Sequence, residues 1–332
     1  MNKKNILLIC GGGASEHEIS LISAKYIKSQ LEKINKYNIF YVEMTKDGTR
    51  KDERGCVVEL RKGGILFEAQ IQKETQLHFA IPCFHGPPGE TGQIQSVFEM
   101  MKLAYLGCGP EASALCFNKI STKLWFNALN IPNSPFLFID QINNENKLKS
   151  ENFLETEKKI FVKSSSQGSS LGCYFVKNKS DLEMAIKHAF ELSPYVLIEK
   201  CIEGRELEMA VYEYEGKVIA TNPGEIIAPN QFYDFDQKYS KTSKAITNVE
   251  AKGLETKDII IMKELAIKAF TSLKLRHLSR IDFFLNQNGS IYINEINTFP
   301  GMTPISMFPK MMESNEHNFT KFLESIIDNN IE

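Results

Sequence analysis

The sequence has no apolar run long enough to cross a membrane. Its longest apolar runs, residues 6–10 and 81–84, fall far short of the roughly 18 residues that a membrane helix requires. The basic start, residues 1–4, is not followed by the longer apolar stretch and small-residue cleavage site of a signal peptide. We therefore expect a cytoplasmic protein that does not span a membrane.

Neither sign of charge is in excess. Lysine and arginine together number 39 and aspartate and glutamate 41, so the formal net charge is -2. This balance lacks the basic footprint that nucleic acids or anionic membranes attract, and neither is expected as a partner. Any anionic ligand must be bound by a local cluster of cations.

Several chemical motifs are also missing. The seven cysteines contain no Cys-x-x-Cys spacing, which favours reduced core thiols over a zinc site or disulfides. The six histidines form no His-Glu-x-x-His pattern, so zinc chemistry is not expected. The chain also lacks the Gly-x-x-x-x-Gly-Lys-Ser/Thr loop of the Walker A nucleotide-binding proteins.

What remains is the composition of an enzyme-sized globular protein. A chain of 332 residues with 42% hydrophobic residues is long enough for two or three domains with sizeable cores. Apolar runs alternate with helical periodicity in the first hundred residues, which predicts α/β layering, and the middle of the chain predicts a compact α+β unit. Strands are expected at residues 5–10, 39–42, 78–84, 160–163, 173–177, 195–199, 205–214, 217–221, 278–285 and 290–296. Helices are expected near residues 21–31, 93–103, 112–130, 180–192 and 259–273, and the polar stretch 140–159 is expected to be a solvated surface.

The last two strands predict a hairpin. A turn centred on residues 287–288 would place Asp282 opposite Ile293 and Arg280 opposite Glu295. Because side chains alternate between the two faces of a sheet, the polar residues of both strands would project from one face.

This face would carry Arg280, Asp282, Glu295 and Asn297, and its carboxylates form a candidate metal site. Diagonal neighbours on one face lie within roughly 8 Å, so Asp282 and Glu295 can share hard cations. Oxygen ligands favour magnesium or manganese. The alternative is a surface ion-pair ladder, but the adjoining loop 298–303 favours a metal site beside a substrate loop.

A second candidate site is Lys163 with the Ser/Gly-rich loop 164–172, which joins two expected strands. Small residues let backbone N–H groups approach an anion, and the lysine adds a point charge, which suits a polyphosphate. Taken alone, the loop is equally well explained as a flexible linker. Lys119 and Lys238 are further candidates for phosphate contacts, although a single lysine is ordinarily a solvated surface residue.

Two more loops, 11–18 and 85–92, follow buried strands in the first hundred residues. The first lacks the third glycine of a dinucleotide fingerprint, and Glu16 and Glu18 at its helix start would repel phosphate. A carboxylate on a glycine loop better suits an ammonium group, although stabilisation by the helix dipole also explains an acidic residue there. Since ligands bind at the carboxyl ends of strands, the two loops are expected to form one rim of a cleft.

In combination these motifs resemble the D-alanine–D-alanine ligases of the ATP-grasp superfamily over essentially the whole chain. The matching segments are residues 11–23 (GGGASEHEISLIS), 85–92 (HGPPGETG), 163–172 (KSSSQGSSLG), 199–206 (EKCIEGRE), 232–239 (FYDFDQKY) and 280–306, which includes NEINTFPGMTPIS. The resemblance implies an α/β and α+β multidomain protein, with an ATP-grasp fold preceded by a Rossmann-like (pre-ATP-grasp) α/β domain. The expected domains are residues 1–115, 116–200 and 201–332, with ATP held between the last two.

The resemblance also implies how ATP and metal are bound. The ATP-binding residues would be Lys119, Lys163, Ser169, Ser170, Glu199, Lys200, Ile202, Glu206 and Lys238. Among them, the three lysines 119, 163 and 238 would contact phosphates, residues 199, 200 and 202 would border the adenine, and Glu206 would take the ribose. Two magnesium or manganese ions would be held by Asp282, Glu295 and Asn297.

The remaining matches imply roles toward the amino acids. Glu16 would bind the amino group of the first D-alanine and form a hydrogen-bonded trio with Ser169 and Tyr239. Arg280 and the backbone N–H of Gly301 would stabilise an oxyanion. The second amino acid would lie near His85, with its carboxylate at Ser306 and the backbone of Met307, and Lys238 would also border the substrates.

The implied activity is ATP-dependent joining of two D-alanine molecules through an acyl phosphate, for peptidoglycan precursor synthesis. A homodimer is also implied. Alternatives are a ligase for D-alanine and another amino acid such as D-serine, and a nucleotide-binding protein without turnover. A nicotinamide oxidoreductase, suggested by the first glycine loop, is disfavoured.

The chain departs from the family pattern at a few positions. Ser164 stands where members usually have proline, Asn118 where they have aspartate, and Thr91 within a motif that usually reads Gly-Glu-Asp-Gly. The Pro-Ala pair that usually follows the loop containing residues 232–239 is replaced by residues 248–251 (NVEA). No departure removes an expected ligand or catalytic charge, so an active enzyme is expected, with loop dynamics and acceptor preference open. Lys238 with Tyr239 favours an amine acceptor over D-lactate.

Overall fold

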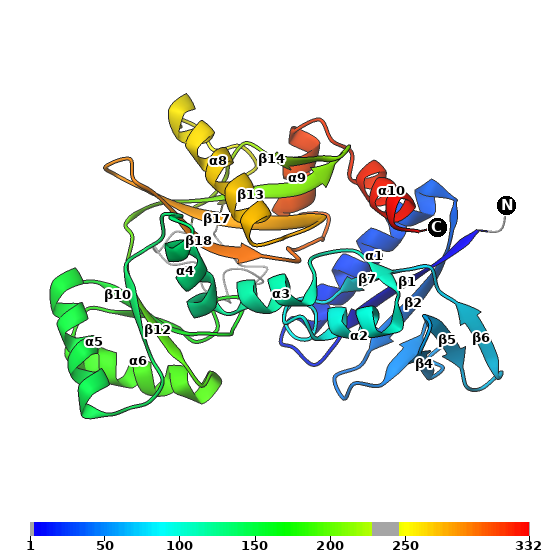
Figure 1. Cartoon of the computed structure of the whole chain (residues 1–332), viewed down its shortest axis with the longest axis horizontal. Helices are drawn as coiled ribbons and strands as arrows, with labels where there is room; N and C mark the ends of the chain where they lie inside the picture. Colours follow the sequence, from blue (N-terminus) through cyan, green and yellow to red (C-terminus); the bar gives the residue numbers. More distant parts are fainter. Residues whose placement is uncertain (1–2, 228–245, 332) are drawn as a thin grey trace.

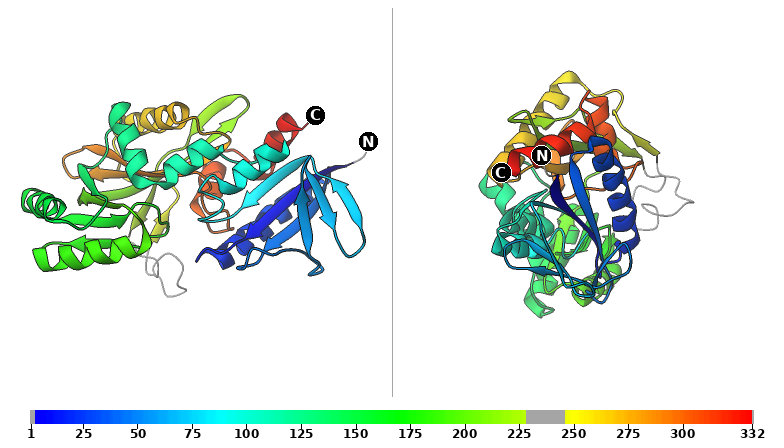
Figure 2. Two further views of the ribbon diagram at one scale, coloured as in Figure 1. Left: turned by 60° about the horizontal axis from the view of Figure 1, so that its bottom comes forward. Right: turned by 90° about the vertical axis from the view of Figure 1, so that its right-hand side faces the viewer.

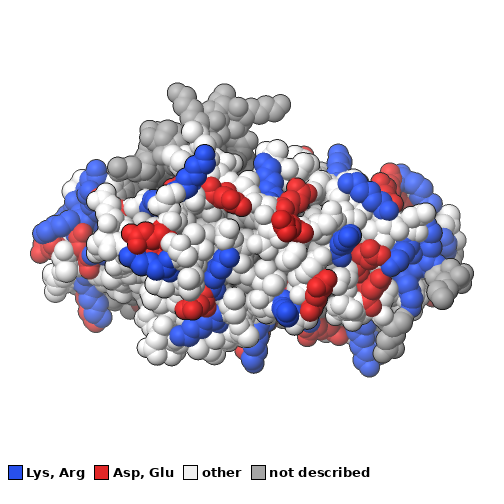
Figure 3. Space-filling model, turned by 90° about the horizontal axis from the view of Figure 1, so that it is seen from above, with Lys and Arg blue, Asp and Glu red and all other residues white. Residues whose placement is uncertain are grey.

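The structure is a computed structural model that describes residues 3–227 and 246–331. Four sheets with helices packed against them form an elongated molecule, in which residues near the N-terminus lie at one end and α5 (Asn144–Glu157) and α6 (Lys179–Leu192) at the other (Figure 1). Within the described ranges, no helix is both long and apolar enough to cross a membrane. Positive and negative side chains are interspersed over the face in Figure 3, as the nearly balanced composition leads one to expect.

The first sheet has the strand order β3-β2-β1-β7-β8. Its strands are β1 (Lys4–Gly11), β2 (Tyr37–Met44), β3 (Arg50–Asp52), β7 (Phe79–Cys83) and β8 (Ala104–Tyr105). β1 pairs in parallel with β2 and β7, and its residues 6–10 are fully buried because both faces of the strand are covered. Helix α1 (His17–Ile34) begins after the loop that follows β1, so this loop lies at the carboxyl edge of the sheet.

A small antiparallel sheet extends the first unit. It has the order β4-β5-β6 and consists of β4 (Val58–Arg61), β5 (Ile65–Glu68) and β6 (Lys73–Gln76). Figure 2 shows these strands fanning out at the end of the molecule that holds β1 and β2. The pattern analysis missed all three, since each is only four residues long.

The chain then passes through three helices to a second sheet. The helices are α2 (Gln93–Met101), α3 (Pro110–Phe117) and α4 (Lys119–Ala128), so the single helix expected at 112–130 is broken at Asn118. Asn118 has an extended backbone and caps α4 by accepting a hydrogen bond from the N–H of Ser121. The polar stretch 140–159, expected to be a solvated surface, contains the helix α5.

The second sheet is antiparallel, with the order β11-β10-β12-β9. Its strands are β9 (Phe136–Ile139), β10 (Ile160–Ser164), β11 (Cys173–Val176) and β12 (Val196–Lys200). Helix α6 packs against it and closes a core that includes Val162 and Ile198. The Ser/Gly-rich loop joins β10 to β11, two strands, as predicted.

The third sheet has the order β16-β15-β13-β17-β18, with β14 paired to β13. Its strands are β13 (Gly204–Tyr214), β14 (Lys217–Ala220), β15 (Gly224–Ile227), β16 (Ile246–Asn248), β17 (Leu278–Asn286) and β18 (Ile291–Asn297). Helix α8 (Thr256–Ser272) covers one face of β13 and β14 (Figure 1). The chain ends with α9 (Met307–Ser314) and α10 (Phe319–Asn330).

The register predicted for the β17–β18 hairpin is wrong. Asp282 lies opposite Glu295 rather than Ile293, and Arg280 lies opposite Asn297 rather than Glu295. The turn contains one residue more than expected, because Asn286 pairs with Ser290, and a bulge between Asp282 and Phe283 shifts the register again. The four polar side chains nevertheless share one face, as the alternation predicted.

The hydrophobic cores cross the domain boundaries expected near residues 115 and 200. Phe308 of α9 and Phe322 of α10 belong to the same core as Ile6 of β1. The ring of Tyr26 in α1 also stacks on Phe319 of α10, with 5.8 Å between ring centroids. The first and last parts of the chain therefore support each other, and the exact boundaries stay a prediction.

Candidate active site

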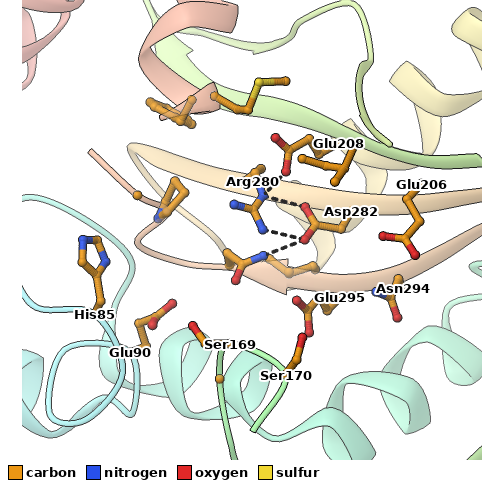
Figure 4. A pocket seen from close by; sticks show the side chains of 18 of the residues that line it. His85, Glu90, Ser169, Ser170, Glu206, Glu208, Arg280, Asp282, Asn294 and Glu295 are labelled. Atoms are coloured by element: carbon orange, nitrogen blue, oxygen red, sulfur yellow. Dashed lines mark hydrogen bonds and ion pairs between the residues drawn. The ribbon is translucent and has the colours of Figure 1, made fainter. Parts of the chain in front are cut away.

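One cavity of about 870 Å³ lies where the first sheet, the second sheet and the third sheet meet. It is lined by the loop after β1, the loop after β7, the Ser/Gly-rich loop, the polar face of β17 and β18, and the loop before α9. The expected site residues on this lining are Glu16, His85, Lys119, Lys163, Ser169, Ser170, Ile202, Glu206, Arg280, Asp282, Glu295, Asn297, Gly301, Ser306 and Met307. Segments almost 300 residues apart in sequence thus contribute to one site (Figure 4).

We call the part of the cavity formed by Glu16, His85 and Glu90 its acidic end. Glu16 stands at the N-terminal end of α1 and accepts a hydrogen bond of 2.6 Å from the hydroxyl of Ser169, which ties the Ser/Gly-rich loop to the first glycine loop. The ring of His85 is bonded to the hydroxyl of Ser23 through Nε2, at 2.8 Å. Burial lowers the pKa of His85, against the opposing effect of Glu16, so the imidazole is neutral at physiological pH.

Glu90 is a second carboxyl group at this end. Its Oε2 accepts a 2.7 Å hydrogen bond from the N–H of Gly86. Burial, together with repulsion from Glu16, raises the pKa of Glu90 to about 8. The acidic end thus holds two neighbouring carboxyl groups, whose oxygens can accept hydrogen bonds from a cationic ligand such as an ammonium group.

Arg280 occupies the middle of the cavity and is held by two carboxylates (Figure 4). It donates to Asp282 through two hydrogen bonds of 2.7 Å each, and its Nε lies 2.8 Å from Oε2 of Glu208. Burial disfavours the charged guanidinium, but Asp282 and Glu208 outweigh this and raise the pKa of Arg280. A fixed cation is therefore aimed into the cavity from β17.

We call the part of the cavity around Lys119 and Lys163 its lysine end. The Nζ of Lys119 lies 3.2 Å from Glu295 and donates to the backbone oxygen of Gln167 in the Ser/Gly-rich loop at 2.9 Å. The Nζ of Lys163 lies 2.5 Å from Oε1 of the buried Glu199. Burial would lower the pKa of Lys163, but the Glu199 carboxylate outweighs it and raises that pKa. The two lysines converge from different elements on one side of the cavity.

The loop before α9 closes the site from the third sheet. Its hydroxyl groups are bonded internally: the Oγ of Ser306 lies 3.0 Å from the N–H and 2.8 Å from the Oγ1 of Thr303. Gly301 approaches the same hydroxyl closely, because a Cβ at this position would lie 2.9 Å from Oγ of Ser306. A side chain at position 301 would therefore displace the Ser306 hydroxyl, and Ser306 leads directly into the N-terminus of α9 at Met307.

Of the expected site residues, two lie outside the described part of the chain and two described ones are not on the cavity lining. Lys238 and Tyr239 lie outside the described residues. Lys200 turns its ammonium toward Glu157 of α5, at 2.8 Å. Glu199 is buried behind the cavity wall, where its carboxylate contacts Lys163.

The expected metal ligands fit a hard divalent cation by their chemistry. Asp282 and Glu295 are paired in register and offer carboxylate oxygens, and the amide of Asn297 is bonded to Asp282 at 3.1 Å. Among the residues that the structure describes, no group of three or more His, Cys, Asp or Glu side chains could hold a metal ion, and the amide oxygen of Asn297 is the third oxygen in the expected ligand set. An oxygen-only set of two carboxylates and one amide suits magnesium or manganese and not zinc.

Two departures from the family pattern are explained by the structure. Ser164 stands where the family pattern has proline, and its N–H donates to the backbone oxygen of Gly172 at 2.9 Å. This hydrogen bond closes the base of the Ser/Gly-rich loop, and proline, which has no N–H, could not make it. Asn118, which replaces an aspartate, provides the helix cap that an aspartate would provide.

Three polar residues of the site were missed or left without a role by sequence reasoning. Glu208 follows Glu206 by two residues on β13, and this alternation is a signal that could have placed it on the polar face of the sheet. Glu90 lies inside the recognised motif 85–92. Lys123 is fully buried in α4, and nothing in the helical pattern distinguishes it from a surface lysine.

The fold and the cavity together define a ligase of the ATP-grasp class. Residues 5–108 match the family model described as "D-ala D-ala ligase N-terminus", and residues 125–328 match the one described as "D-ala D-ala ligase C-terminus". The chain belongs to the D-alanine–D-alanine ligase family.

Individual relatives agree with this assignment. The D-alanine–D-alanine ligase of Shewanella oneidensis is 50% identical, over 100% of this chain and 99% of that protein, and the one of Shewanella amazonensis is 47% identical over 98% of both. Among solved structures, the D-alanyl-alanine synthetase A of Vibrio cholerae superposes with a TM-score of 0.94 at 48% identity, covering 99% of each chain. The VanG D-Ala:D-Ser ligase of Enterococcus faecalis superposes with a TM-score of 0.88 at 26% identity, covering 99% of this chain and 100% of that one.

Proposed function

We propose that this protein joins two molecules of D-alanine to D-alanyl-D-alanine at the expense of ATP, for peptidoglycan precursor synthesis. The observation that carries the proposal is the division of the cavity. Its acidic end, with Glu16 and Glu90, suits amino groups, its lysine end suits phosphates, and Arg280 lies between the two. Phosphoryl transfer to an amino-acid carboxylate needs a site for the amino group, a site for the triphosphate and a cation between them.

In the first step, a carboxylate oxygen of the first D-alanine attacks the γ-phosphorus of ATP. A P–O bond to that oxygen forms, the bond to the β-phosphate oxygen breaks, and ADP leaves. Glu16 holds the ammonium group of the amino acid, while Lys119, Lys163 and Lys238 hold the triphosphate. The chain's contribution is to place the two reactants in line and to neutralise charge on the transferred phosphoryl group.

In the second step, the amino group of the second D-alanine attacks the carbonyl carbon of the acyl phosphate. A C–N bond forms, the developing oxyanion is stabilised by Arg280 and the backbone N–H of Gly301, and inorganic phosphate leaves with the original carboxylate oxygen. The carboxylate of the second amino acid is held by Ser306 and the N–H of Met307 at the start of α9, where the helix dipole favours an anion. His85 lies beside this second substrate.

The nucleophilic amine must be unprotonated before it attacks. Glu90 is a carboxyl group at the acidic end whose pKa is raised to about 8, so the fraction that is ionised near neutral pH can accept this proton. Neutral His85 adds no positive charge that would repel the incoming ammonium group.

The metal is assigned to Asp282, Glu295 and Asn297, with two magnesium or manganese ions expected. When bound, such ions neutralise negative charge on the phosphate oxygens. The same carboxylates contact cationic side chains: the Nζ of Lys119 lies 3.2 Å from Glu295, and Arg280 lies 2.7 Å from Asp282.

Phosphate release from ATP with D-alanine, compared with L-alanine, tests the proposal. We expect D-alanine-dependent release of inorganic phosphate and formation of the dipeptide, and little with L-alanine. Product analysis with mixed D-alanine and D-serine then separates a D-alanine–D-alanine ligase from a D-alanine–D-serine ligase. No D-alanine-dependent release would refute the proposal and favour a nucleotide-binding protein without turnover.

Two further expectations are part of the proposal. We expect a homodimer in solution, which light scattering after size-exclusion chromatography measures directly. We also expect the protein in the cytoplasm, where ATP is available, and cell fractionation tests this.

A further inference from the structure

A buried cluster of charges lies behind the lysine end of the cavity. Lys123 of α4, Ser134 and Glu199 of β12 form it, and none of the three belongs to the cavity lining. The side chains of Lys123 and Glu199 are each only 2% exposed. Lysine is rarely buried to this extent, because removing its charged ammonium group from water is energetically costly.

The contacts in the cluster are complete and short. The Nζ of Lys123 lies 2.9 Å from Oε2 of Glu199 and donates to the Oγ of Ser134 at 2.7 Å. The Ser134 hydroxyl donates in turn to the same carboxylate oxygen, at 2.8 Å. The other oxygen, Oε1, is left to face Lys163, whose Nζ lies at 2.5 Å. One carboxylate is therefore shared by two lysines, one buried and one at the cavity.

Counting the charges shows what Lys123 adds. A pair consisting of Lys163 and Glu199 alone would be neutral, and an anionic ligand would then gain little from Lys163. With Lys123 present, the cluster carries one net positive charge, and Lys163 is the member that borders the cavity. Because electrostatic interactions are strong in a poorly solvated site, this unit of charge matters to a polyphosphate.

The protonation state of Glu199 agrees with this count. Burial alone would raise the pKa of Glu199, but Lys123 and Lys163 outweigh it and hold that pKa well below its ordinary value. Burial lowers the pKa of Lys123, and Glu199 opposes the shift. Glu199 therefore stays ionised and keeps both lysines as its partners.

We propose that Lys123, together with Ser134, is a positioning residue for ATP. It fixes the Glu199 carboxylate from behind and compensates its charge, so that Lys163 is oriented toward the cavity and its charge remains available to the triphosphate. Lys123 does not touch the nucleotide. The inference rests on the proposed function in one respect, namely that Lys163 contacts the phosphates of ATP.

The test compares the variants Lys123→Met and Lys123→Arg with the wild type, and Lys187→Met serves as a control because Lys187 is exposed on α6. For Lys123→Met we expect the KM for ATP to rise about tenfold, with the KM for D-alanine within about twofold of wild type. Lys123→Arg, which keeps the charge, should recover most of the affinity for ATP. Lys187→Met should change neither constant.

A double-mutant cycle tests whether Lys123 acts on ATP binding through Glu199. Removing Lys123 in a Glu199→Gln background should raise the KM for ATP by less than about twofold, because the buried charge that Lys123 compensates is gone. The proposal is overturned if folded Lys123→Met has a normal KM for ATP, if the KM values for ATP and D-alanine rise together, or if the loss is equal in both backgrounds.

Should Lys123→Met not fold, the variant Ser134→Ala decides the question. It retains all charges and removes only the hydroxyl that orients the Glu199 carboxylate, and we expect the KM for ATP to rise about threefold. An unchanged KM for ATP in this variant would overturn the proposal. Direct calorimetric titration with ATP separates this inference from the proposed function, since ATP binding can depend on Lys123 even if the wild type does not turn over D-alanine.

Discussion

The carboxyl groups at the two ends of the cavity have opposite surroundings. At the lysine end, Glu199 and Glu295 each have an ammonium group within 3.2 Å. At the acidic end, Glu16 and Glu90 lie close enough that Glu16 helps to raise the pKa of Glu90. The first arrangement places ammonium groups where a polyanion can bind, and the second places carboxyl oxygens that can accept hydrogen bonds from an ammonium group. One cavity can thereby bind ATP and an amino acid in a fixed order around Arg280.

Removing Arg280 breaks the link between the two ends and should have the largest effect. In Arg280→Met the developing oxyanion loses its cation, and we expect kcat for D-alanine-dependent phosphate release to fall by about 10³-fold. The matched control is Arg205→Met: Arg205 is also part-buried on the third sheet and donates to Glu225 at 2.6 and 2.9 Å, but it is not part of the cavity lining. Both variants should lose thermal stability, and only Arg280→Met should lose turnover. Equal losses of turnover would contradict the role of Arg280.

The second-largest effect is expected when one carboxylate of the proposed metal site is removed. In Asp282→Asn we expect the magnesium concentration needed for half-maximal activity to rise about 10- to 100-fold, because one of the two negative charges is lost. Titration of activity with magnesium measures this. Asp258→Asn is the control, since Asp258 is buried in the first turn of α8 and lies outside the cavity. A similar shift in both variants would argue against a metal site at Asp282.

The acidic end is tested by the pH dependence of stability in Glu90→Gln. The pKa of Glu90 is about 8 in the folded protein and near the ordinary 4.5 when unfolded, so the folded state binds the extra proton. The stability that protonated Glu90 contributes is therefore fully present below the unfolded pKa and is lost as the pH rises toward 8. Glutamine stays neutral and can still accept the N–H of Gly86. At about pH 8.5 we expect the variant to melt about 2–4 °C above the wild type, and at about pH 6 the difference should be smaller.

Thermal unfolding followed by circular dichroism at several pH values makes this measurement. Glu111→Gln removes an exposed carboxyl group from the first turn of α3 and should leave the pH dependence unchanged. If Glu90→Gln follows the wild-type curve at every pH, Glu90 is not a carboxyl group that burial keeps protonated.

The smallest effect is expected for Lys200→Met. The family resemblance places Lys200 beside the adenine, but its ammonium contacts Glu157 at 2.8 Å and is directed away from the cavity. We expect the KM for ATP to change by less than about twofold, as for other surface ion pairs. A rise above about tenfold would mean that Lys200 turns toward the nucleotide when it binds.

Sequence patterns predicted most strands and helices of this fold, because buried parallel strands and amphipathic helices leave strong signals. The polar face of the β17–β18 hairpin was also predictable, since alternation does not depend on register. The register itself was not, because one additional turn residue and the bulge at Asp282 leave no signal in hydrophobicity. The short strands β4, β5 and β6 were missed because runs of four residues give only a weak alternation signal.

The site shows the same limit. Residues in recognisable motifs, such as Glu16 and Lys163, were predicted and lie on the cavity. Lys123 was not, because its importance arises from contacts with Ser134 and Glu199, which lie much further along the chain, and its burial appears only in three dimensions. The role of such a residue can be recognised only when the charged groups around it are known from the structure.

The most direct test of the account follows one oxygen atom. D-Alanine labelled with oxygen-18 in its carboxyl group is incubated with ATP and the enzyme, and the inorganic phosphate released is analysed by mass spectrometry. The account predicts one labelled oxygen in each phosphate formed together with D-alanyl-D-alanine, since the carboxylate oxygen leaves with the phosphoryl group of the acyl phosphate. Dipeptide formation with unlabelled phosphate would contradict it.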